Sequence, residues 1–222
     1  MTETTRDLQR LVDLAASLRP RFAAEKPLPR LLFVTDPERT PDPAAVAKRL
    51  PPGSGVIYRA FGASDALGRA LDLRRIATAR GLVLLIGADA GLAVACGADG
   101  LHLPERAIAD AATFRTVRPG WVITAAAHTL EAAQRASRAG CDAVLASTVF
   151  QSRSASAGEP MGAEGFDAFV QAAPLPAYAL GGVTADTAAQ LAGSGAAGFA
   201  MVEGLVSAVQ DGSQPEDGSA SS

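Results

Sequence analysis

The sequence predicts a (β/α)8 barrel (TIM barrel) with an extra N-terminal helix and a disordered C-terminal tail. Short β-rich runs alternate with Ala-rich stretches of helical periodicity along most of the chain. This alternation indicates parallel strands joined by right-handed crossovers, and eight strands favour closure into a barrel. A doubly wound open sheet is the alternative that the pattern leaves open. The length of 222 residues fits one barrel, since such domains reach ~200–250 residues.

The predicted strands are short and aliphatic, and helical stretches separate them. The eight strands are Leu31–Thr35, Val56–Arg59, Leu82–Ile86, Leu101–Leu103, Trp121–Ala125, Ala143–Phe150, Ala177–Leu180 and Phe199–Val202. The helices between them include Pro43–Leu50, Ser64–Arg80, Thr129–Ala139, Ala163–Ala173 and Thr184–Ala192. Gly81 and Gly140 follow predicted helices, and Thr184 is a predicted N-cap.

Three regions follow one another along the chain. Residues 1–28 are predicted to form a helical extension with an amphipathic helix at Asp7–Leu18, and residues 29–208 to form the barrel. Residues 209–222 are predicted to be disordered, because they are rich in Gly, Ser, Asp and Pro. The last barrel helix is short, so the N-terminal helix is expected to cover the surface beside it.

Composition excludes several classes of protein. A net charge of −3 gives no footprint for nucleic acid. No apolar run reaches the ~18–20 residues of a membrane span, and the N-terminus lacks the apolar core of a signal peptide. Cys96 and Cys141 have no metal-ligand spacing, so both are predicted to be buried in a reducing compartment. These features predict a cytoplasmic protein with a small-molecule ligand.

Glycines close the last two predicted strands. Gly181-Gly182 follows the seventh strand, and the eighth strand leads into Val202-Glu203-Gly204. Glycine lets backbone N–H groups approach a ligand, and the last two strands of a (β/α)8 barrel are where such folds hold a phosphate. The alternative is that the glycines serve only tight turns. Glu203 is unusual here, since a carboxylate repels phosphate; it either points away or indicates another ligand.

Three segments together resemble one known family. They are residues 97–103 (GADGLHL), residues 140–150 (GCDAVLASTVF), and residues 179–183 (ALGGV) with 198–202 (GFAMV). The chain is similar, from roughly Leu31 to Leu205, to the thiamin phosphate synthase and thiazole tautomerase (TenI-like) family of (β/α)8 barrels. The resemblance implies a small phosphorylated heterocyclic ligand. It places a thiazole phosphate at the two glycine turns, with Ser147 and Thr148 as further candidate substrate-binding residues.

The synthases of this family join a pyrimidine methyl diphosphate to a thiazole phosphate, with Mg2+ and basic groups stabilising the departing pyrophosphate. This chain departs from that pattern at the diphosphate end. Of the Gln-Leu-Arg-Glu-Lys run after the second strand only Arg59 is kept, Gly87-Ala88 replaces an Asn-Asp pair, and Ala107 replaces a second Asp.

Asp89 and Glu105 are the remaining candidate ligands for Mg2+. The alternative for Asp89 is a residue at the start of a helix, favoured there by the macrodipole. Glu105 alone would make a weak magnesium site.

The loop after the sixth strand replaces the family's threonines and lysines with Ser152-Arg153-Ser154. Hydroxyl and guanidinium donors suit phosphate oxygens, although a surface loop of this composition is equally common. The tautomerase branch places a histidine where this chain has Thr148, which is no base near neutral pH.

Two histidines lie near the carboxyl ends of the fourth and fifth strands, the reacting face of a barrel. Because strand residues alternate, His102 points opposite to Leu101 and Leu103. His102, His128 and Arg59 are therefore the candidate catalytic residues, with a structural role as the alternative for each histidine.

Three functions remain open at this point. The first is a divergent transferase of the thiamin phosphate synthase type, favoured by Arg59 and the Ser-Arg-Ser loop. The second is an isomerase of the tautomerase type with another general base. The third is a non-catalytic barrel that binds thiazole phosphate or thiamin phosphate, and loss of the metal carboxylates favours the second and third.

Overall fold

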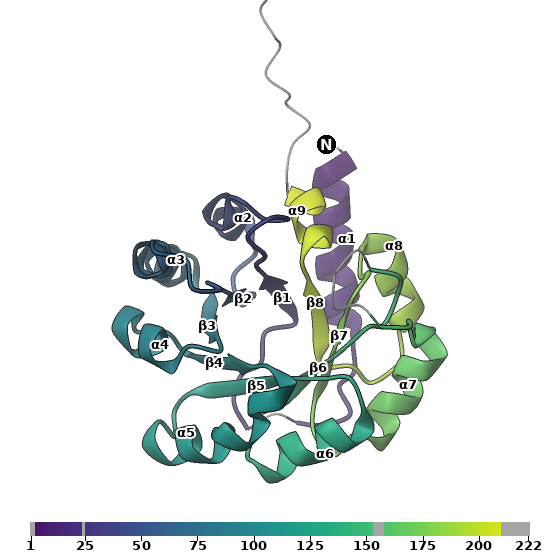
Figure 1. Ribbon diagram of the computed structural model, residues 1–222. Helices are drawn as coiled ribbons and strands as arrows, with labels where there is room; N and C mark the ends of the chain where they lie inside the picture. The colour runs from purple at the N-terminus through teal and green to yellow at the C-terminus, as the bar shows by residue number, and fades with distance from the viewer. Residues whose placement is uncertain (1–2, 24, 153–157, 210–222) are drawn as a thin grey trace, which may run out of the picture.

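The computed structural model describes residues 3–23, 25–152 and 158–209. Eight parallel strands form a closed barrel in chain order, and pairing of the first strand with the last closes it (Figure 1). The strands are β1 Leu31–Val34, β2 Gly55–Tyr58, β3 Val83–Gly87, β4 Gly100–Leu103, β5 Val122–Ala127, β6 Ala143–Ala146, β7 Ala177–Leu180 and β8 Gly198–Met201. The predicted barrel is confirmed, and the open-sheet alternative is wrong.

Helices surround the barrel and connect successive strands (Figure 1). They are α1 Glu3–Ser17, α2 Pro43–Arg49, α3 Ala66–Arg80, α4 Ala90–Cys96, α5 Ala111–Val117, α6 Leu130–Arg138, α7 Gly162–Ala172, α8 Ala185–Ala188 and α9 Glu203–Val209, with 3-10 turns η1 Glu105–Asp110 and η2 Ala189–Leu191. Gly81 ends α3 in the left-handed conformation, with φ of 66°. Thr184 caps α8 by accepting the N–H of Thr187, as its position before Asp186 predicted.

The sixth strand is shorter than its composition predicts. The ladder of β6 ends at Ala146 instead of Phe150. The chain then turns across the barrel mouth, where the N–H of Val149 donates to the Leu180 carbonyl and that of Phe150 to the Gly181 carbonyl. Residues 147–150 therefore form a wall beside the end of β7.

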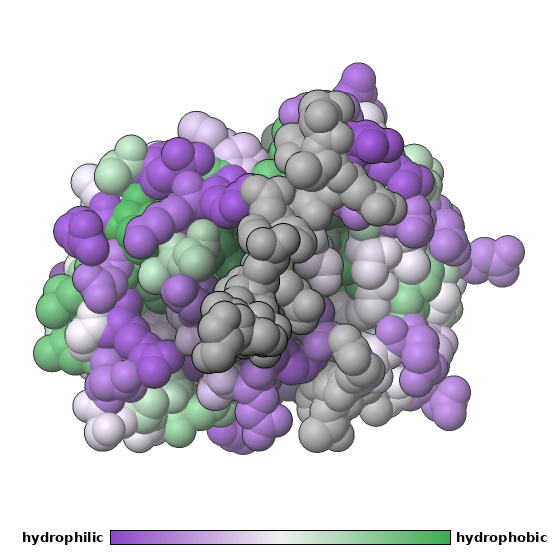
Figure 2. Space-filling model, turned by 90° about the horizontal axis from the view of Figure 1, so that it is seen from above, coloured by the Kyte–Doolittle hydropathy of each residue, from purple (hydrophilic) through white to green (hydrophobic). Residues whose placement is uncertain are grey.

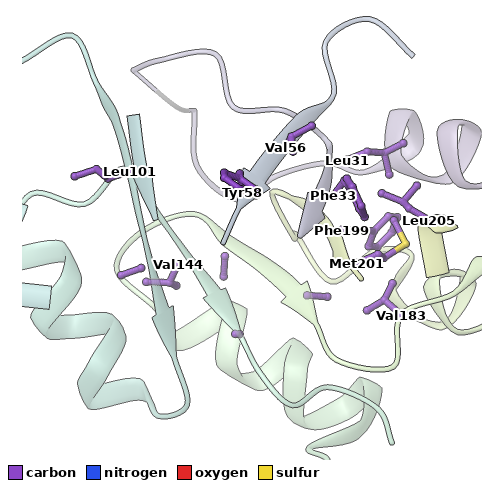
Figure 3. Close-up of a cluster of buried hydrophobic side chains, with 14 of the residues drawn as sticks. Leu31, Phe33, Val56, Tyr58, Leu101, Val144, Val183, Phe199, Met201 and Leu205 are labelled. Atoms are coloured by element: carbon purple, nitrogen blue, oxygen red, sulfur yellow. The ribbon is translucent and has the colours of Figure 1, made fainter. Parts of the chain in front are cut away.

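The barrel has an inner and an outer apolar layer. Leu32, Ile57 and Leu145 belong to the inner cluster. The outer cluster lies between strands and helices, and Figure 3 shows Phe33 and Phe199 within it. Complete burial of such a side chain contributes ~1.5–3 kcal/mol. The strands are buried on both faces, which is why they lack a polar alternation.

The helix α1 lies against α9 and α8, on the side of the barrel where the last helix is short (Figure 1). Its residues Leu11 and Ala15 are buried, and so is Leu18 directly after the helix. The helix thus covers the surface that it was expected to cover. The division at residues 28 and 29 stays a prediction, and the predicted tail lies outside the described residues except for Val209, which is buried in α9.

The cysteines are free and buried, as predicted. Burial raises the pKa of the Cys141 thiol to about 12. In the part of the chain that the structure describes, no helix is long and apolar enough to cross a membrane. Figure 2 shows one face of the molecule, on which hydrophilic and hydrophobic residues are interspersed.

Candidate functional site

A pocket with a volume of about 380 Å³ lies at the carboxyl ends of the strands. Its walls come from the segments that follow β6, β7 and β8, together with two arginines from the loops after β1 and β2. Of the residues predicted to contact substrate or to react, those that line it are Arg59, His128, Ser147, Thr148, Ser152, Gly181, Gly182, Val202, Glu203 and Gly204. This end of a (β/α)8 barrel is where such enzymes hold their substrates.

The two glycine turns form one side of the pocket. Gly181 and Gly182 both adopt positive φ, of 96° and 63°. A Cβ on Gly182 would overlap the carbonyl oxygen of Gln151, and one on Gly204 would overlap that of Val183. Backbone packing requires both glycines, which agrees with the tight-turn interpretation. The same turns face the pocket, so the phosphate interpretation stays a prediction.

A histidine–serine contact forms a second wall. His128 directly follows β5, and its Nδ1 lies 2.9 Å from the carbonyl oxygen of Ser147 and 3.2 Å from its Oγ. Thr148 is buried next to this pair and also lines the pocket. His128 thus presents an imidazole to the pocket, and Ser147 holds its Nδ1.

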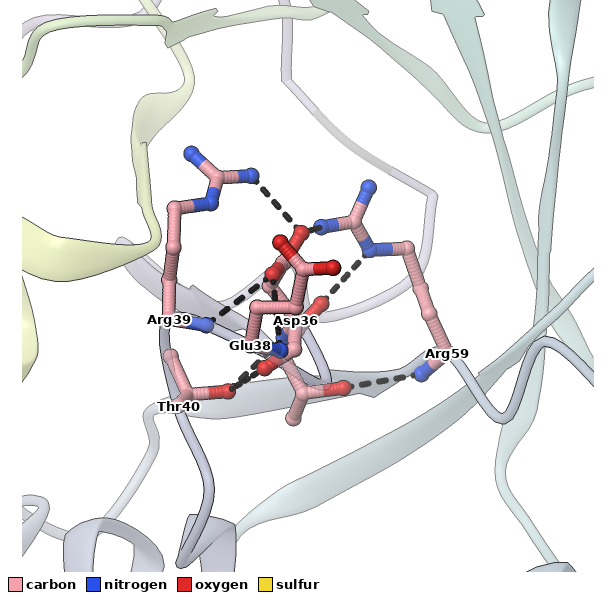
Figure 4. Close-up of polar contacts among 6 residues, drawn as sticks. Asp36, Glu38, Arg39, Thr40 and Arg59 are labelled. Atoms are coloured by element: carbon pink, nitrogen blue, oxygen red, sulfur yellow. Dashed lines mark hydrogen bonds and ion pairs between the residues drawn. The ribbon is translucent and has the colours of Figure 1, made fainter. Parts of the chain in front are cut away.

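An arginine–carboxylate cluster forms the third wall (Figure 4). Asp36, after β1, accepts from Arg39 Nη2 at 2.8 Å and from Arg59 Nη2 at 3.3 Å, both through Oδ2. Arg59 also donates from Nε to the Thr35 carbonyl at 2.6 Å. The hydrogen bond from the Arg39 side chain lowers the pKa of Asp36 to about 2. Burial lowers the pKa of Arg59, although a guanidinium remains charged at any pH of interest.

Sequence reasoning missed Asp36 and Arg39. Neither matched a motif, and their meeting with Arg59 depends on two loops that are separated in the chain by α2 and β2. One signal was present: Asp36 directly follows the first predicted strand, and a polar residue there faces the mouth of a barrel.

His102 occupies a different place from His128. Its Nδ1 lies 3.0 Å from Thr124 Oγ1, inside the barrel, and the imidazole is buried. Burial, followed by the positive charge of Arg59, lowers the pKa of His102 to about 3. The imidazole is therefore neutral at pH 7, below the pocket and in contact with a neighbouring strand, and this favours the structural alternative.

We expect His102 to make the fold sensitive to mild acid. Its native pKa lies below the ordinary value of 6.5, so the unfolded chain takes up the proton first. The associated stability is complete above pH ~6.5 and falls with decreasing pH by as much as about 1.4 kcal/mol per unit. Urea unfolding between pH 7 and pH 4.5 should give a clearly flatter profile for His102→Gln than for the natural protein. Parallel profiles would contradict a buried, neutral imidazole.

The candidate magnesium ligands are both engaged elsewhere. Asp89 caps α4 by accepting the N–H of Leu92 at 2.8 Å, as its alternative interpretation predicted. Glu105 accepts the backbone N–H of His128 at 2.9 Å and pairs with Arg135 at 3.1 Å. Among the described residues, no three His, Cys, Asp or Glu side chains gather as a metal site would require. This donor set does not fit Mg2+.

Gly87 explains part of this difference. A Cβ at this position would lie 2.9 Å from Arg59 Cγ, so the glycine leaves room for the arginine side chain. The residue that follows, Ala88, has a φ of 61°, which is rare for alanine and more readily adopted by Asn or Asp.

Arg153 and Ser154 lie outside the described residues, while Ser152 of the same loop lines the pocket.

Comparison with known proteins agrees with the barrel. The profile of the family described as thiamine monophosphate synthase matches residues 31–205. The chain is 34% identical over 143 residues to a thiamine-phosphate synthase of Methanoculleus marisnigri, covering 64% of this chain and 68% of that protein. It is 31% identical over 197 residues to that of Chlorobium luteolum, covering 85% and 89%.

Among solved structures, the fold is similar to that of a thiamine phosphate pyrophosphorylase from Pyrococcus furiosus. The TM-score is 0.68 at 22% identity, and the match covers 88% of this chain and 97% of the other. The profile match spans nearly the whole barrel, and the Chlorobium relative aligns over most of both chains. The chain belongs to the thiamine monophosphate synthase family.

Proposed function

We propose that this chain is a transferase of the thiamin phosphate synthase type, acting on a phosphorylated thiazole and a pyrimidine diphosphate in thiamin biosynthesis. The observation that carries the proposal is the pocket at the carboxyl end of the barrel, which combines the glycine turns after β7 and β8 with arginines from the loops after β1 and β2. Family membership and the names of the curated relatives support it.

Each wall of the pocket has a task in this proposal. Backbone N–H groups of the turns at Gly182 and Gly204 bind the thiazole phosphate. Arg59 stabilises the negative charge that develops on the departing pyrophosphate, because a guanidinium offers several donors in a fixed geometry. His128, held by Ser147, is placed to exchange a proton with a ring bound between these walls.

A second function is favoured by one observation. Asp89 forms a helix cap and Glu105 an ion pair, so the described part of the barrel offers no carboxylate cluster for a metal-assisted departure of pyrophosphate. This favours a barrel that binds thiazole phosphate or thiamin phosphate without turning it over. The isomerase alternative would depend on His128 as its base, since Thr148 holds the place of the tautomerase histidine.

A thermal-shift panel tests the proposal. Thiazole phosphate, the pyrimidine diphosphate and thiamin phosphate are each added with and without Mg2+. A ligand at ~100 times its Kd should stabilise the protein by ~2.7 kcal/mol, a shift of several degrees. We expect stabilisation by both precursors. Stabilisation by thiazole phosphate or thiamin phosphate alone, without turnover, would support the binding function, and no response to any of the three would overturn the proposal.

A further inference from the structure

Two guanidiniums share one carboxylate oxygen at the mouth of the barrel. Nη2 of Arg39 and Nη2 of Arg59 both contact Oδ2 of Asp36, so the two cations are held close together from different loops. Figure 4 shows the side chains reaching Asp36 from opposite sides. Both arginines line the pocket.

Within this cluster the positive charges outnumber the negative one, while the carboxylates of Asp7 and Glu203 line other parts of the pocket. The single negative charge of Asp36 faces two positive charges, and its pKa of about 2 keeps it ionised at neutral pH. The negative charge of Glu203 also raises the pKa of Arg39, although less than Asp36 does. Arg39 therefore offsets part of the negative charge that would repel a phosphate at the turn after β8.

The arginines retain donors for a ligand. A guanidinium carries five N–H donors, and the hydrogen bond from Arg39 to Asp36 uses Nη2. Arg59 uses Nε and Nη2, and its guanidinium carbon lies 5.2 Å from the Phe61 ring centre, which helps to fix its direction. Since the bonds to Asp36 orient both side chains before a ligand arrives, little side-chain entropy is lost on binding.

We propose that Arg39 is a binding residue, which together with Arg59 forms a site for a phosphate or pyrophosphate group that works without a divalent metal. Asp36 is the positioning residue of the pair. The inference rests on the proposed function only for the identity of the natural ligand, since the anion site itself follows from the cluster. Such a site would let the pocket hold a highly charged group although the described residues form no carboxylate cluster for a metal.

Calorimetric titration of the full chain with inorganic pyrophosphate tests the site. We expect binding in EDTA, with affinity lowered about 10- to 100-fold in Arg39→Gln, because a charge-assisted hydrogen bond is removed. Arg39→Lys keeps the charge without the fork and should fall between the two. Arg75→Gln is the matched control, since Arg75 is an exposed arginine on α3 outside the pocket. Its affinity should equal that of the natural protein.

Two results would overturn the inference: pyrophosphate that binds only when Mg2+ is present, or equal affinities for the natural protein, Arg39→Gln and Arg39→Lys. Circular dichroism checks that each variant is folded. If Arg39→Gln does not fold, Arg39→Lys is compared with the natural protein in its place.

The outcome is separable from the proposed function. Pyrophosphate binding through Arg39 without any response to thiazole phosphate would overturn the proposed function alone, and the opposite pattern would overturn the inference alone.

Discussion

With both thiamin precursors and Mg2+, this protein is expected to form thiamin phosphate ~10⁴-fold more slowly than the Chlorobium luteolum relative assayed in parallel. The family's charge-stabilising groups at the diphosphate end are replaced by Phe61, Gly87, Ala88 and Ala107. Removal of one group that stabilises developing charge costs about 2.7–4 kcal/mol. Such losses are not additive, but two together reach the expected factor.

A coupled assay for thiamin phosphate measures this rate, and Ala88→Asp provides the matched variant. Ala88 stands where the resemblance places a metal-binding Asp, and its φ of 61° suits Asp better than Ala. The variant should therefore fold well and gain a rate that depends on Mg2+. Turnover of the natural protein at the rate of its relative would show that Arg39 and Arg59 fully replace the missing groups, and would contradict the expected slow reaction.

Gly182→Val is expected to abolish binding of thiazole phosphate and to destabilise the fold by several kcal/mol. A β-branched residue is strained at φ of 63°, which alone costs ~1–3 kcal/mol. The new Cβ would in addition lie 2.7 Å from Phe150 Cβ and overlap the Gln151 carbonyl oxygen, so the wall beside β7 must move. Urea unfolding gives the loss of stability, and thermal shift with thiazole phosphate gives the loss of binding.

Gly193→Val separates strain from contact. Gly193 also has positive φ, of 90°, but a Cβ there would meet nothing within 4 Å, and this glycine is not part of the pocket. This variant should lose only the stability that the backbone strain costs, and it should bind ligand normally. If Gly182→Val matched it in both stability and affinity, the turn after β7 would be neither tightly packed nor part of the ligand site.

Local patterns predicted the barrel because its strands are short aliphatic runs, and aliphatic composition indicates burial. They failed at the end of β6, where Val149 and Phe150 have strand-forming side chains but donate their N–H groups to the segment at the end of β7. Residue identity alone cannot distinguish a continued strand from a chain that turns toward β7, since apolar side chains pack against the barrel in both.

The candidate site was predictable to the extent that it lies at strand ends. The glycine turns, His128 and Arg59 all follow strands and all reach the pocket. The capping role of Asp89 was also predictable, because its partner Leu92 lies three residues further along the chain. The depth of His102 and the contact of Asp36 with Arg59 depend on segments that are far apart in the sequence. Such features appear only when segments distant in the chain are brought together.

The close packing between Gly87 and Arg59 restricts the order in which the family's usual diphosphate end can be rebuilt. Any side chain at position 87 would begin 2.9 Å from Arg59 Cγ, so the arginine that now contacts Asp36 would have to shift. Position 88 carries no such conflict, because its backbone already has the shape that Asp tolerates. Substitution at residue 88 should therefore precede substitution at residue 87, whether in evolution or in the laboratory. In the reverse order the intermediate has a shifted Arg59 and still lacks the carboxylate that would bind a metal.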